Sequence, residues 1–398
     1  MKLSKQSEKI IKTLNIKSSI PTSGNKDIDM LFDLVNKANA ETKDIAIDSK
    51  YFTINSVKDI PKPDSFNSIF LPDIIRESIK NDSTSYIRYI YVLDKRQIRV
   101  NMIFNEENIE LEMDKYTEYI RTILLWLKLI TNFTSNACSN RLTIYLYMTD
   151  FKKILPESSV DTIGINNINS GYSDICKRDS EIVIYRKEEW LKVLMHETFH
   201  NLGLEFGQMN IDSLKVKIKK LFPIESEFAL YESWAESWAL IMNTALCAYK
   251  MLDDSKKKVD FVLYYEFLIF NEKKFTCLQV VKILNHMNLS YDMLIDPNMK
   301  VQVNKLYKEN TNIFAYFIVK LLLVFNDNKF IKWCKKNNPH IVKFLNTEKN
   351  LSSLFNFIKT MYKNKQLISS IRDAEGFYHS QKDNKLKRSL RMSLCELI

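Results

Sequence analysis

Hydrophobic residues in the first half of the chain follow two different periods, one typical of strands and one typical of helices. Residues 86–93 and 97–105 are rich in β-branched and aromatic side chains, and the polar residues 94–96 between them predict a hairpin. The apolar positions of residues 114–131 recur at the spacing of one helix face. Residues 142–148 then return to a strand pattern. We therefore expect a hairpin, a long helix and a further strand, in this order.

The next predicted elements are a strand and a buried helix that follows it directly. Residues 181–186 are again rich in β-branched and aromatic side chains, after a polar stretch. Glu188 and Glu189 supply acidic side chains for the first turn of a helix. The apolar residues between 190 and 202 predict that this helix is buried, and Gly203 is suited to end it.

Helical patterns dominate from residue 211 onward. The expected helices cover residues 211–221, 228–251, 259–270, 278–287, 312–325 and 354–362. Residues 1–60 are polar, with one helix expected near 29–40, and two prolines at 61 and 63 mark a boundary. The chain thus divides into an N-terminal extension (1–63), a segment with the sheet (64–207) and a helical segment (208–398). The expected fold class is α+β, a twisted mixed sheet followed by a mainly helical subdomain.

The helix predicted after residue 189 contains the pattern H-E-x-x-H, in which the fixed residues are His196, Glu197 and His200. Residues four apart lie on one helix face with β-carbons about 5 to 6 Å apart, so both imidazoles can bind one metal ion. Glu197 lies about 100° around the helix from His196, where a carboxylate can accept a proton from water. The chain has five histidines in 398 residues. At that composition, a chance pattern of this kind is expected about a few times in a thousand chains.

A strand that leads into an H-E-x-x-H helix resembles the zincin metallopeptidases. The resemblance implies a zinc ion, a protein or peptide substrate, and a zincin-like fold in which one long helix backs the sheet and the metal-binding helix packs on it. It also implies that the strand at residues 181–186 lies at the edge of the sheet, where substrate pairs as an added strand.

Catalytic zinc commonly has three protein ligands, so a third ligand must come from elsewhere in the chain. Phe206 stands where the metzincin pattern has its third histidine, and Lys219 and Lys220 occupy the region of a thermolysin-like glutamate. The run YESWAESWA, which contains Glu232 and Glu236, closely resembles the E-G-x-A-E motif of gluzincins. By that resemblance, Glu232 is the third zinc ligand and Glu236 accepts a hydrogen bond from a ligand histidine.

The surroundings of Glu232 and Glu236 support a metal site. Their neighbours are apolar almost all round the expected helix, which predicts burial, and two buried carboxylates without a cation would be costly. Ser233 replaces the glycine of the gluzincin motif with another small residue. The alternatives for the third ligand are Glu236, Glu205, Glu225 and Glu227.

Peptide hydrolysis also needs a donor for the oxyanion that forms at the attacked carbonyl. Gluzincins usually supply it from the C-terminal half as tyrosine, histidine or arginine. The adjacent Tyr378 and His379 are our favoured candidates, and His286 and Tyr231 are the alternatives.

Charge and hydropathy limit the other classes of function. The formal net charge is +10, with 58 basic and 48 acidic side chains, which permits binding to nucleic acid or another anionic partner. The densest basic runs carry no interleaved aromatic residues for base stacking, so a solvated surface is favoured. The longest apolar stretch, residues 313–325, is interrupted by Lys320, and we expect no membrane span.

The six cysteines are scattered without C-x-x-C spacing, and residues 1–17 lack the apolar core of a signal peptide. Reduced, buried thiols in a cytosol-like compartment are therefore expected, and a contact of Cys176 with the metal is the minor alternative.

Residues 169–190, together with the two metal motifs, also resemble metallopeptidase-like proteins encoded by large cytoplasmic DNA viruses. This second resemblance implies a host-cytoplasmic or virion setting. Three functions are open at this point: a zinc peptidase with Glu197 as general base, which is favoured; a catalytically silent zincin scaffold, for example in a virion; and a basic nucleic-acid-binding protein.

Overall fold

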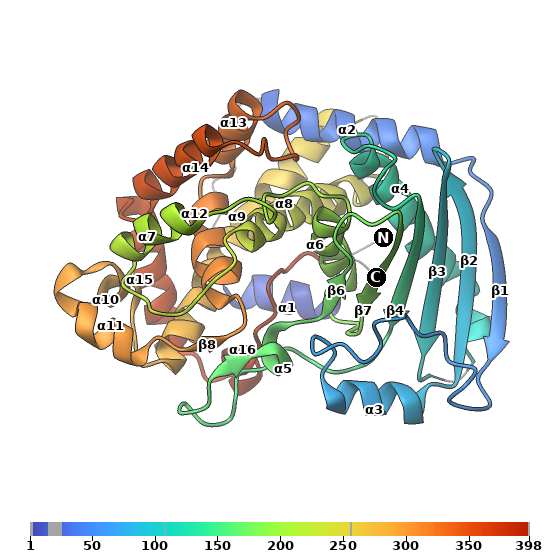
Figure 1. The fold of residues 1–398 in the computed structure, drawn as a ribbon, viewed down its shortest axis with the longest axis horizontal. Helices are drawn as coiled ribbons and strands as arrows, with labels where there is room; N and C mark the ends of the chain where they lie inside the picture. Colours follow the sequence, from blue (N-terminus) through green and yellow to red (C-terminus); the bar gives the residue numbers. More distant parts are fainter. Residues whose placement is uncertain (1–2, 15–25, 107, 255–256, 397–398) are drawn as a thin grey trace.

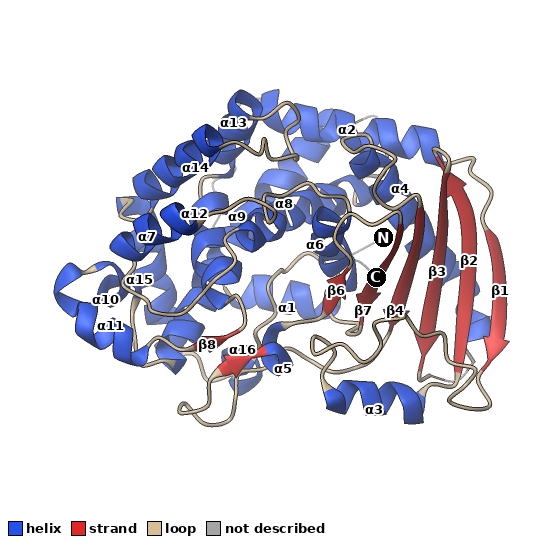
Figure 2. Cartoon of the chain, in the orientation of Figure 1, coloured by secondary structure: helices blue, strands red, loops and turns tan. Residues whose placement is uncertain are grey.

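A six-stranded mixed sheet forms one half of the molecule and helices form the other (Figure 1, Figure 2). The structure is a computed structural model that describes residues 3–14, 26–106, 108–254 and 257–396. The strands in order across the sheet are β1 (Asp48–Thr53), β2 (Ser85–Leu93), β3 (Arg96–Phe104), β4 (Arg141–Tyr147), β7 (Asp179–Ile184) and β6 (Gly171–Ser173). β3, β4 and β7 run parallel, and the remaining neighbours pair antiparallel. The expected α+β class and mixed sheet are confirmed.

The hairpin expected at residues 86–105 is formed by β2 and β3. Its turn consists of Asp94 and Lys95, whose φ angles of 50° and 71° are those that a tight two-residue hairpin turn requires. Arg96 was expected in the turn, but it begins β3 and is buried, because its guanidinium donates hydrogen bonds to the carbonyl oxygens of Cys138 and Ser135.

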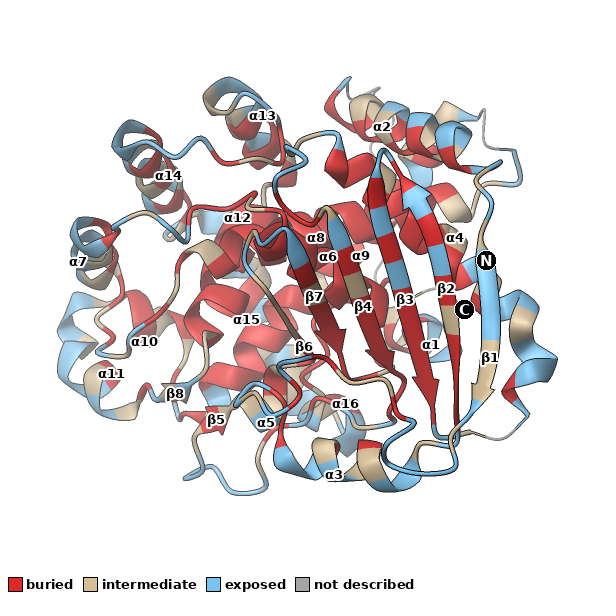
Figure 3. Cartoon of the chain, turned by 45° about the vertical axis from the view of Figure 1, so that its right-hand side comes forward, coloured by how far each residue is buried: buried red, intermediate tan, exposed pale blue. Residues whose placement is uncertain are grey.

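The sheet has a core on each face because successive side chains of a strand point to opposite sides. On β4, Ile144 and Leu146 contribute to the main core, which lies between the sheet and the helices. Tyr145 and Tyr147 contribute to a smaller core on the other face, beneath α3 (Asp73–Asp82) and the segment before it. Figure 3 shows that β4 and β7 are buried along most of their length, whereas exposed and buried positions alternate at the end of β2 and the start of β3.

Five helices position the site. The long helix predicted at residues 114–131 is α4 (Met113–Thr131), which packs on the main-core side with α2 (Lys26–Thr42). The helix that contains H-E-x-x-H is α6 (Trp190–Asn201), and it packs between β7 and α8 (Tyr231–Lys250), which in turn packs on α9 (Lys258–His286).

The remaining elements surround this framework. They are α1 (Lys5–Thr13), α5 (Ile165–Ile168), α7 (Asp212–Leu221), α10 (Tyr291–Ile295), α11 (Lys300–Leu306), α12 (Lys320–Val324), α13 (Asp327–Asn337), α14 (Glu348–Met361), α15 (Lys365–Ser380), α16 (Asn384–Arg388), the 3-10 helices η1 (Ile109–Glu112) and η2 (Pro297–Met299), the π-helical η3 (Phe314–Val319), and the two-stranded sheet of β5 (Ile163–Gly164) and β8 (Glu309–Asn310). The main core includes residues from all three segments that the sequence suggests, and the boundaries at 63 and 207 stay predictions.

Two further expectations about elements are wrong. The helices expected at residues 259–270 and 278–287 are one continuous helix, α9. In the interval between them, Glu272 is buried and accepts hydrogen bonds from the backbone N–H groups of Leu394 and Cys395. The strand expected at the sheet edge is β7, which is second from the edge. The edge strand is β6, whose three residues lie in the polar stretch upstream and carry too little strand pattern to be predicted.

The prediction that all cysteines are reduced is wrong for two of them. Cys138 and Cys176 form a disulfide between loops 38 residues apart, while Cys247, Cys277, Cys334 and Cys395 are free and buried as expected. Sequence spacing carries no sign of this pairing, because the approach of the two loops depends on the tertiary fold. The cytoplasmic setting stays a prediction. No helix in the described part of the chain is long and apolar enough to span a membrane.

Candidate metal centre

Helix α6 is held firmly enough to present its histidines in a fixed direction. All twelve of its residues are buried. Trp126 of α4 donates a hydrogen bond from its indole N–H to Thr198 Oγ1 over 3.0 Å, which ties α6 to the backing helix. The helix ends as predicted at Gly203, whose φ of +62° lies in the left-handed region that favours glycine.

The start of α6 differs from the prediction. The helix begins at Trp190, so Glu188 and Glu189 precede it and are not in its first turn. Both carboxyl groups are buried, and Glu189 accepts hydrogen bonds from Lys153 Nζ (2.9 Å) and from the backbone N–H of Met392 (3.0 Å). These two residues thus serve a buried polar network beneath the site.

Helix α8 directs its two motif glutamates toward α6 because their spacing of four places them on one helix face. The adjacent Trp234 donates a hydrogen bond to the carbonyl of Val342 (3.1 Å) and packs edge-on against Phe344, in a separate aromatic cluster. This packing fixes the rotation of α8, so that Glu232 and Glu236 meet the histidines.

Three donor atoms converge between α6 and α8. His196 Nε2 lies 3.1 Å from both His200 Nε2 and Glu232 Oε2, and His200 Nε2 lies 3.2 Å from the same Glu232 oxygen. A tetrahedral zinc ion about 2.0 to 2.1 Å from each donor holds its ligands about 3.3 Å apart, so the three atoms fit such an ion closely. His196, His200 and Glu232 therefore form a group that could hold a metal ion, and Glu232 occupies the position expected for the third ligand.

Glu236 contacts the imidazole of His196 at Nδ1, the ring nitrogen that is not among the three converging donor atoms. Its Oε2 accepts a hydrogen bond from His196 Nδ1 (3.0 Å), which leaves Nε2 of that ring free to bind a metal. Its Oε1 is bound by Lys192 of α6 and lies 3.9 Å from Lys320 Nζ of α12. The hydrogen bond to His196 is the contact that the gluzincin resemblance implies for Glu236, and the role of Glu236 in supporting a metal stays a prediction.

The other alternative glutamates lie elsewhere. Glu205 is buried, with Oε1 3.7 Å from His200 Nδ1, which is longer than a hydrogen bond, so it faces the second histidine without the contact that Glu236 makes with the first. Glu225 is exposed, and Glu227 forms ion pairs with Lys215 and Lys219 of α7. The position of Glu205 beside His200 was not predicted, because nothing in its sequence position distinguishes it from the neighbouring carboxylates.

The protonation of the cluster follows from burial and mutual attraction. Burial by itself would raise the pKa of Glu232, but the charge of His200 and hydrogen bonds from both histidines outweigh it and hold the pKa well below the usual range. The pKa of Glu236 is likewise low, since Lys192 and His196 outweigh its burial. Burial opposes protonation of His196 and His200, yet the surrounding carboxylates raise the pKa of both rings.

Glu197 lies beside the three donor atoms and does not bind to them. It lines a small cavity together with His196, and both residues keep an exposed fraction of 7%, so the site is not sealed from solvent. Burial raises the pKa of Glu197, although the two histidines partly offset this. A buried carboxylate with a raised pKa, next to a group that could hold a metal ion, has the properties of a general base.

Two tyrosines flank the histidines. The ring of Tyr316, in η3, packs edge-on against His196 at 5.8 Å, and that of Tyr231 packs against His200 at 5.7 Å. Tyr231 was an alternative from the sequence. Tyr316 was missed, because it lies in an apolar stretch that indicates only a buried helix.

The favoured oxyanion candidates, Tyr378 and His379, and the alternative His286 lie on other parts of the fold. Tyr378 of α15 packs beneath Lys387, 4.7 Å from its ring centre, and His379 is exposed. The Nε2 of His286 lies 2.9 Å from the carbonyl oxygen of Asp161. None of the three lines the cavity that contains His196 and Glu197.

Comparisons of the chain with family models, with curated proteins and with solved structures found no match.

Proposed function

We propose that the chain is a zinc-dependent metallopeptidase. The observation that carries the proposal is the convergence of two imidazole nitrogens and one carboxylate oxygen, from His196, His200 and Glu232, at mutual distances of 3.1 to 3.2 Å. Two histidines and one glutamate are a ligand set typical of catalytic zinc, which keeps a further position open. A cavity meets the same site, and it is lined by both the sheet half and the helical half.

Each residue of the site has a separate role in the proposed hydrolysis. His196, His200 and Glu232 would hold the zinc ion, which would supply Lewis acidity and would lower the pKa of a bound water to about 7. Glu197 accepts the proton as water attacks the peptide carbonyl, and then gives it to the departing amine. Tyr316 lines the same cavity as Glu197, so its hydroxyl is the donor that we assign to the oxyanion.

An extended peptide is the substrate that best suits the edge of the sheet. β6 pairs antiparallel with β7 on one side, and no other described strand pairs with it. Its Gly171 lines the cavity together with His196 and Glu197. A peptide that adds to this edge through main-chain hydrogen bonds would therefore pass the metal site.

The test separates metal binding from turnover. Zinc-loaded wild-type protein should cleave members of a mixed peptide pool, read by mass spectrometry. Glu197→Gln should retain one zinc per chain and lose at least about a hundredfold in rate, since the general base is removed. Tyr316→Phe should retain zinc and lower kcat more than it changes KM.

The matched control is Glu225→Gln, which changes an exposed glutamate outside the site and should keep both zinc and activity. Zinc binding without cleavage of any peptide by the wild type would contradict the peptidase proposal and favour a silent scaffold. Equal cleavage by wild type and Glu197→Gln would contradict the role of the base.

A further inference from the structure

A segment near the C-terminus passes beneath the metal centre and contributes one side chain to its cavity. Residues 389–395 follow α16, and every residue from Leu390 to Cys395 is buried. Met392 lines the cavity together with His196 and Glu197. We call residues 389–395 the C-terminal strap. The strap thus places a methionine beside residues of the candidate site that are distant from it in sequence.

The backbone of the strap is fixed on both sides of Met392. The backbone N–H of Met392 donates a hydrogen bond to the carboxylate of Glu189 (3.0 Å), and its carbonyl oxygen accepts one from Lys320 Nζ (3.5 Å). Two residues further on, the N–H of Leu394 donates to Oε1 of the buried Glu272 (2.8 Å). The backbone position of Met392 is therefore set, and its unbranched side chain is the adaptable part of the strap at this point.

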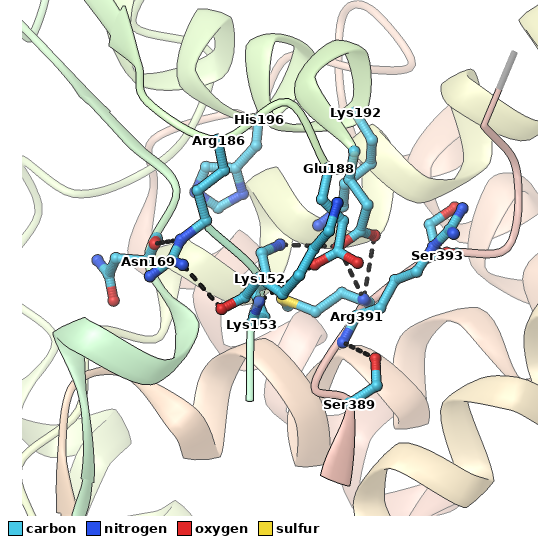
Figure 4. A network of polar contacts seen from close by, with 12 residues as sticks. Lys152, Lys153, Asn169, Arg186, Glu188, Lys192, His196, Ser389, Arg391 and Ser393 are labelled. Carbon is cyan, nitrogen blue, oxygen red and sulfur yellow. Dashed lines mark hydrogen bonds and ion pairs between the residues drawn. The ribbon is translucent and has the colours of Figure 1, made fainter. Parts of the chain in front are cut away.

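The charged side chains of the cavity wall are already paired with one another. Lys192 binds Glu236, and Lys153 donates to Glu189 (2.9 Å). Figure 4 shows Lys153 and Lys192 within this buried polar network. Glu197, the other carboxyl group that lines the cavity, is the base proposed above. A charged side chain of a substrate would have to break one of the buried pairs, which is strongly unfavourable, so the cavity favours an uncharged group.

Three apolar side chains, those of Ile168, Val193 and Met392, form the uncharged wall, and all three are buried. Val193 lies directly beside the edge strand, since a β-carbon added at Gly171 would come within 3.1 Å of its Cγ1. Ile168 belongs to α5, which leads into the same strand. Met392 is thus the apolar wall residue that can change without disturbing α6 or the edge strand. The other uncharged residues of the lining are Asn169, Ser170, Gly171 and Tyr316.

The volume of the cavity, about 40 Å³, limits which side chain fits. One water needs about 10 to 15 Å³ by this measure, so about three water-sized groups can enter. The side chains of alanine, serine, threonine and valine have no more heavy atoms than this. Those of leucine and phenylalanine have more and would collide with the wall.

We propose that Met392 sets the specificity of the site by admitting only a small, uncharged side chain of the substrate next to the cleaved bond. The inference rests on the metallopeptidase function proposed above. The cavity touches Glu197 and the edge strand together, so the side chain that enters it belongs to one of the two residues that flank the scissile bond. The substrate class is therefore peptides with glycine, alanine, serine, threonine or valine at that position.

The test compares hydroxamic acids, because a hydroxamate binds zinc directly. One series carries the side chain on the amino side of the zinc-binding group, as N-acetyl amino-acid hydroxamates do. The other carries it on the carboxyl side, as 2-substituted succinyl hydroxamates do. Isothermal titration of the zinc-loaded wild type should show, in one of the two series, that the methyl compound binds about tenfold or more tightly than the benzyl compound, because an oversized group has to displace the buried wall.

Variants assign this preference to Met392. Met392→Ala enlarges the cavity and should bring the ratio of the two affinities close to one. Met392→Leu keeps the volume of the side chain and should keep the preference. The matched control is Met361→Ala, which truncates a buried methionine of α14 outside the cavity and should also keep it. If Met392→Ala does not fold, Met392→Val, which shortens the side chain less, should give an intermediate ratio.

The outcomes separate this inference from the proposed function. Equal affinity for methyl and benzyl compounds in both series, or a preference that survives Met392→Ala or Met392→Val unchanged, would overturn the role of Met392 and leave the metallopeptidase proposal standing. No binding of any hydroxamate to protein with one zinc per chain would overturn both.

Cleavage of a mixed peptide pool, read by mass spectrometry, extends the test to substrates. The zinc-loaded wild type should cut next to glycine, alanine, serine, threonine or valine, and Met392→Ala should also cut next to leucine and phenylalanine. Cleavage by the wild type next to leucine and phenylalanine as readily as next to alanine, on both sides of the bond, would contradict the inference.

Discussion

Replacing Glu236 by glutamine should weaken zinc binding without removing a zinc ligand. In the wild type, Oε2 of Glu236 accepts a hydrogen bond from His196 Nδ1 over 3.0 Å, and Oε1 is bound by Lys192. A glutamine has one carbonyl oxygen, so it can satisfy only one of these two donors. Its NH2 group must then face either the imidazole N–H or the lysine ammonium, which are both donors.

The magnitude follows from the role of Glu236 as a supporting residue. Loss of such a partner typically costs about 10- to 100-fold in metal affinity, or about 1.4 to 2.7 kcal/mol. The variant also leaves Lys192 and Lys320 without their carboxylate in a buried site, which lowers the free energy of unfolding by about 3 to 5 kcal/mol.

Zinc affinity would be measured by competition with a chelator of known affinity, at a temperature below the unfolding transition of each variant. Glu232→Gln serves as the comparison, because it removes a direct ligand and should weaken binding more than Glu236→Gln does. Glu227→Gln, which changes an exposed ion pair on α7, is the matched control and should bind zinc as the wild type does.

The zinc affinities of Glu236→Gln and Glu232→Gln can contradict the roles assigned to these two glutamates. Zinc affinity unchanged in Glu236→Gln would show that the contact with His196 does not support the metal site. A larger loss in Glu236→Gln than in Glu232→Gln would show that Glu236 is the ligand, and would reverse the assignment.

Three further predictions concern stability and the sheet edge. Burial raises the pKa of Glu309 to about 8, so the contribution of its protonated form to stability is present below pH 4.5 and is lost as pH rises through 8. Glu309→Gln should therefore unfold at a higher temperature than the wild type at pH 9 but not at pH 5. A difference in unfolding temperature that does not depend on pH would contradict this. Cys138→Ser should lower the free energy of unfolding in urea by about 3 to 4 kcal/mol, because the 38-residue loop to Cys176 is no longer closed; no difference from the wild type under oxidising conditions would contradict it. A β-carbon at Gly171 would lie 2.8 Å from the backbone of β7, so Gly171→Ala should displace the edge strand and abolish peptide cleavage with zinc retained. The control is Gly376→Ala, where a β-carbon meets nothing within 4 Å, and it should change neither cleavage nor zinc content. Full activity of Gly171→Ala would refute the role of the sheet edge in binding the peptide.

The sequence alone predicts the parts of the site that depend on local geometry. The spacing of His196 and His200 places them on one face of a helix, and the same holds for Glu232 and Glu236. The boundaries of α4 and α8 follow from apolar spacing, and Gly203 marks the end of α6. These features need only helix periodicity and backbone preference.

The parts that were missed depend on contacts between distant segments. Tyr316 packs against His196 only when η3 is in place, and Glu205 faces His200 only through the fold of the loop after α6. Tyr378 and His379 were favoured because they form an adjacent tyrosine and histidine in the expected half of the chain, a criterion that carries no information about direction or distance. The edge strand β6 is too short for a periodic pattern.

Buried charge misleads sequence reasoning in a consistent way. Lys320 looks like an interruption of an apolar stretch, yet it is fully buried beside Glu236. Glu188 and Glu189 look like the acidic first turn of a helix, yet they belong to the polar network under the site. In each case the charge indicates a polar partner inside the fold, which only the tertiary structure identifies.

Anomalous X-ray diffraction at the zinc absorption edge, on crystals of zinc-loaded protein, tests the central claim most directly. The account predicts one strong peak about 2.0 to 2.2 Å from Nε2 of His196, Nε2 of His200 and a carboxylate oxygen of Glu232. A fully zinc-loaded crystal with no peak between these three side chains, or with its peak at other residues, would contradict it.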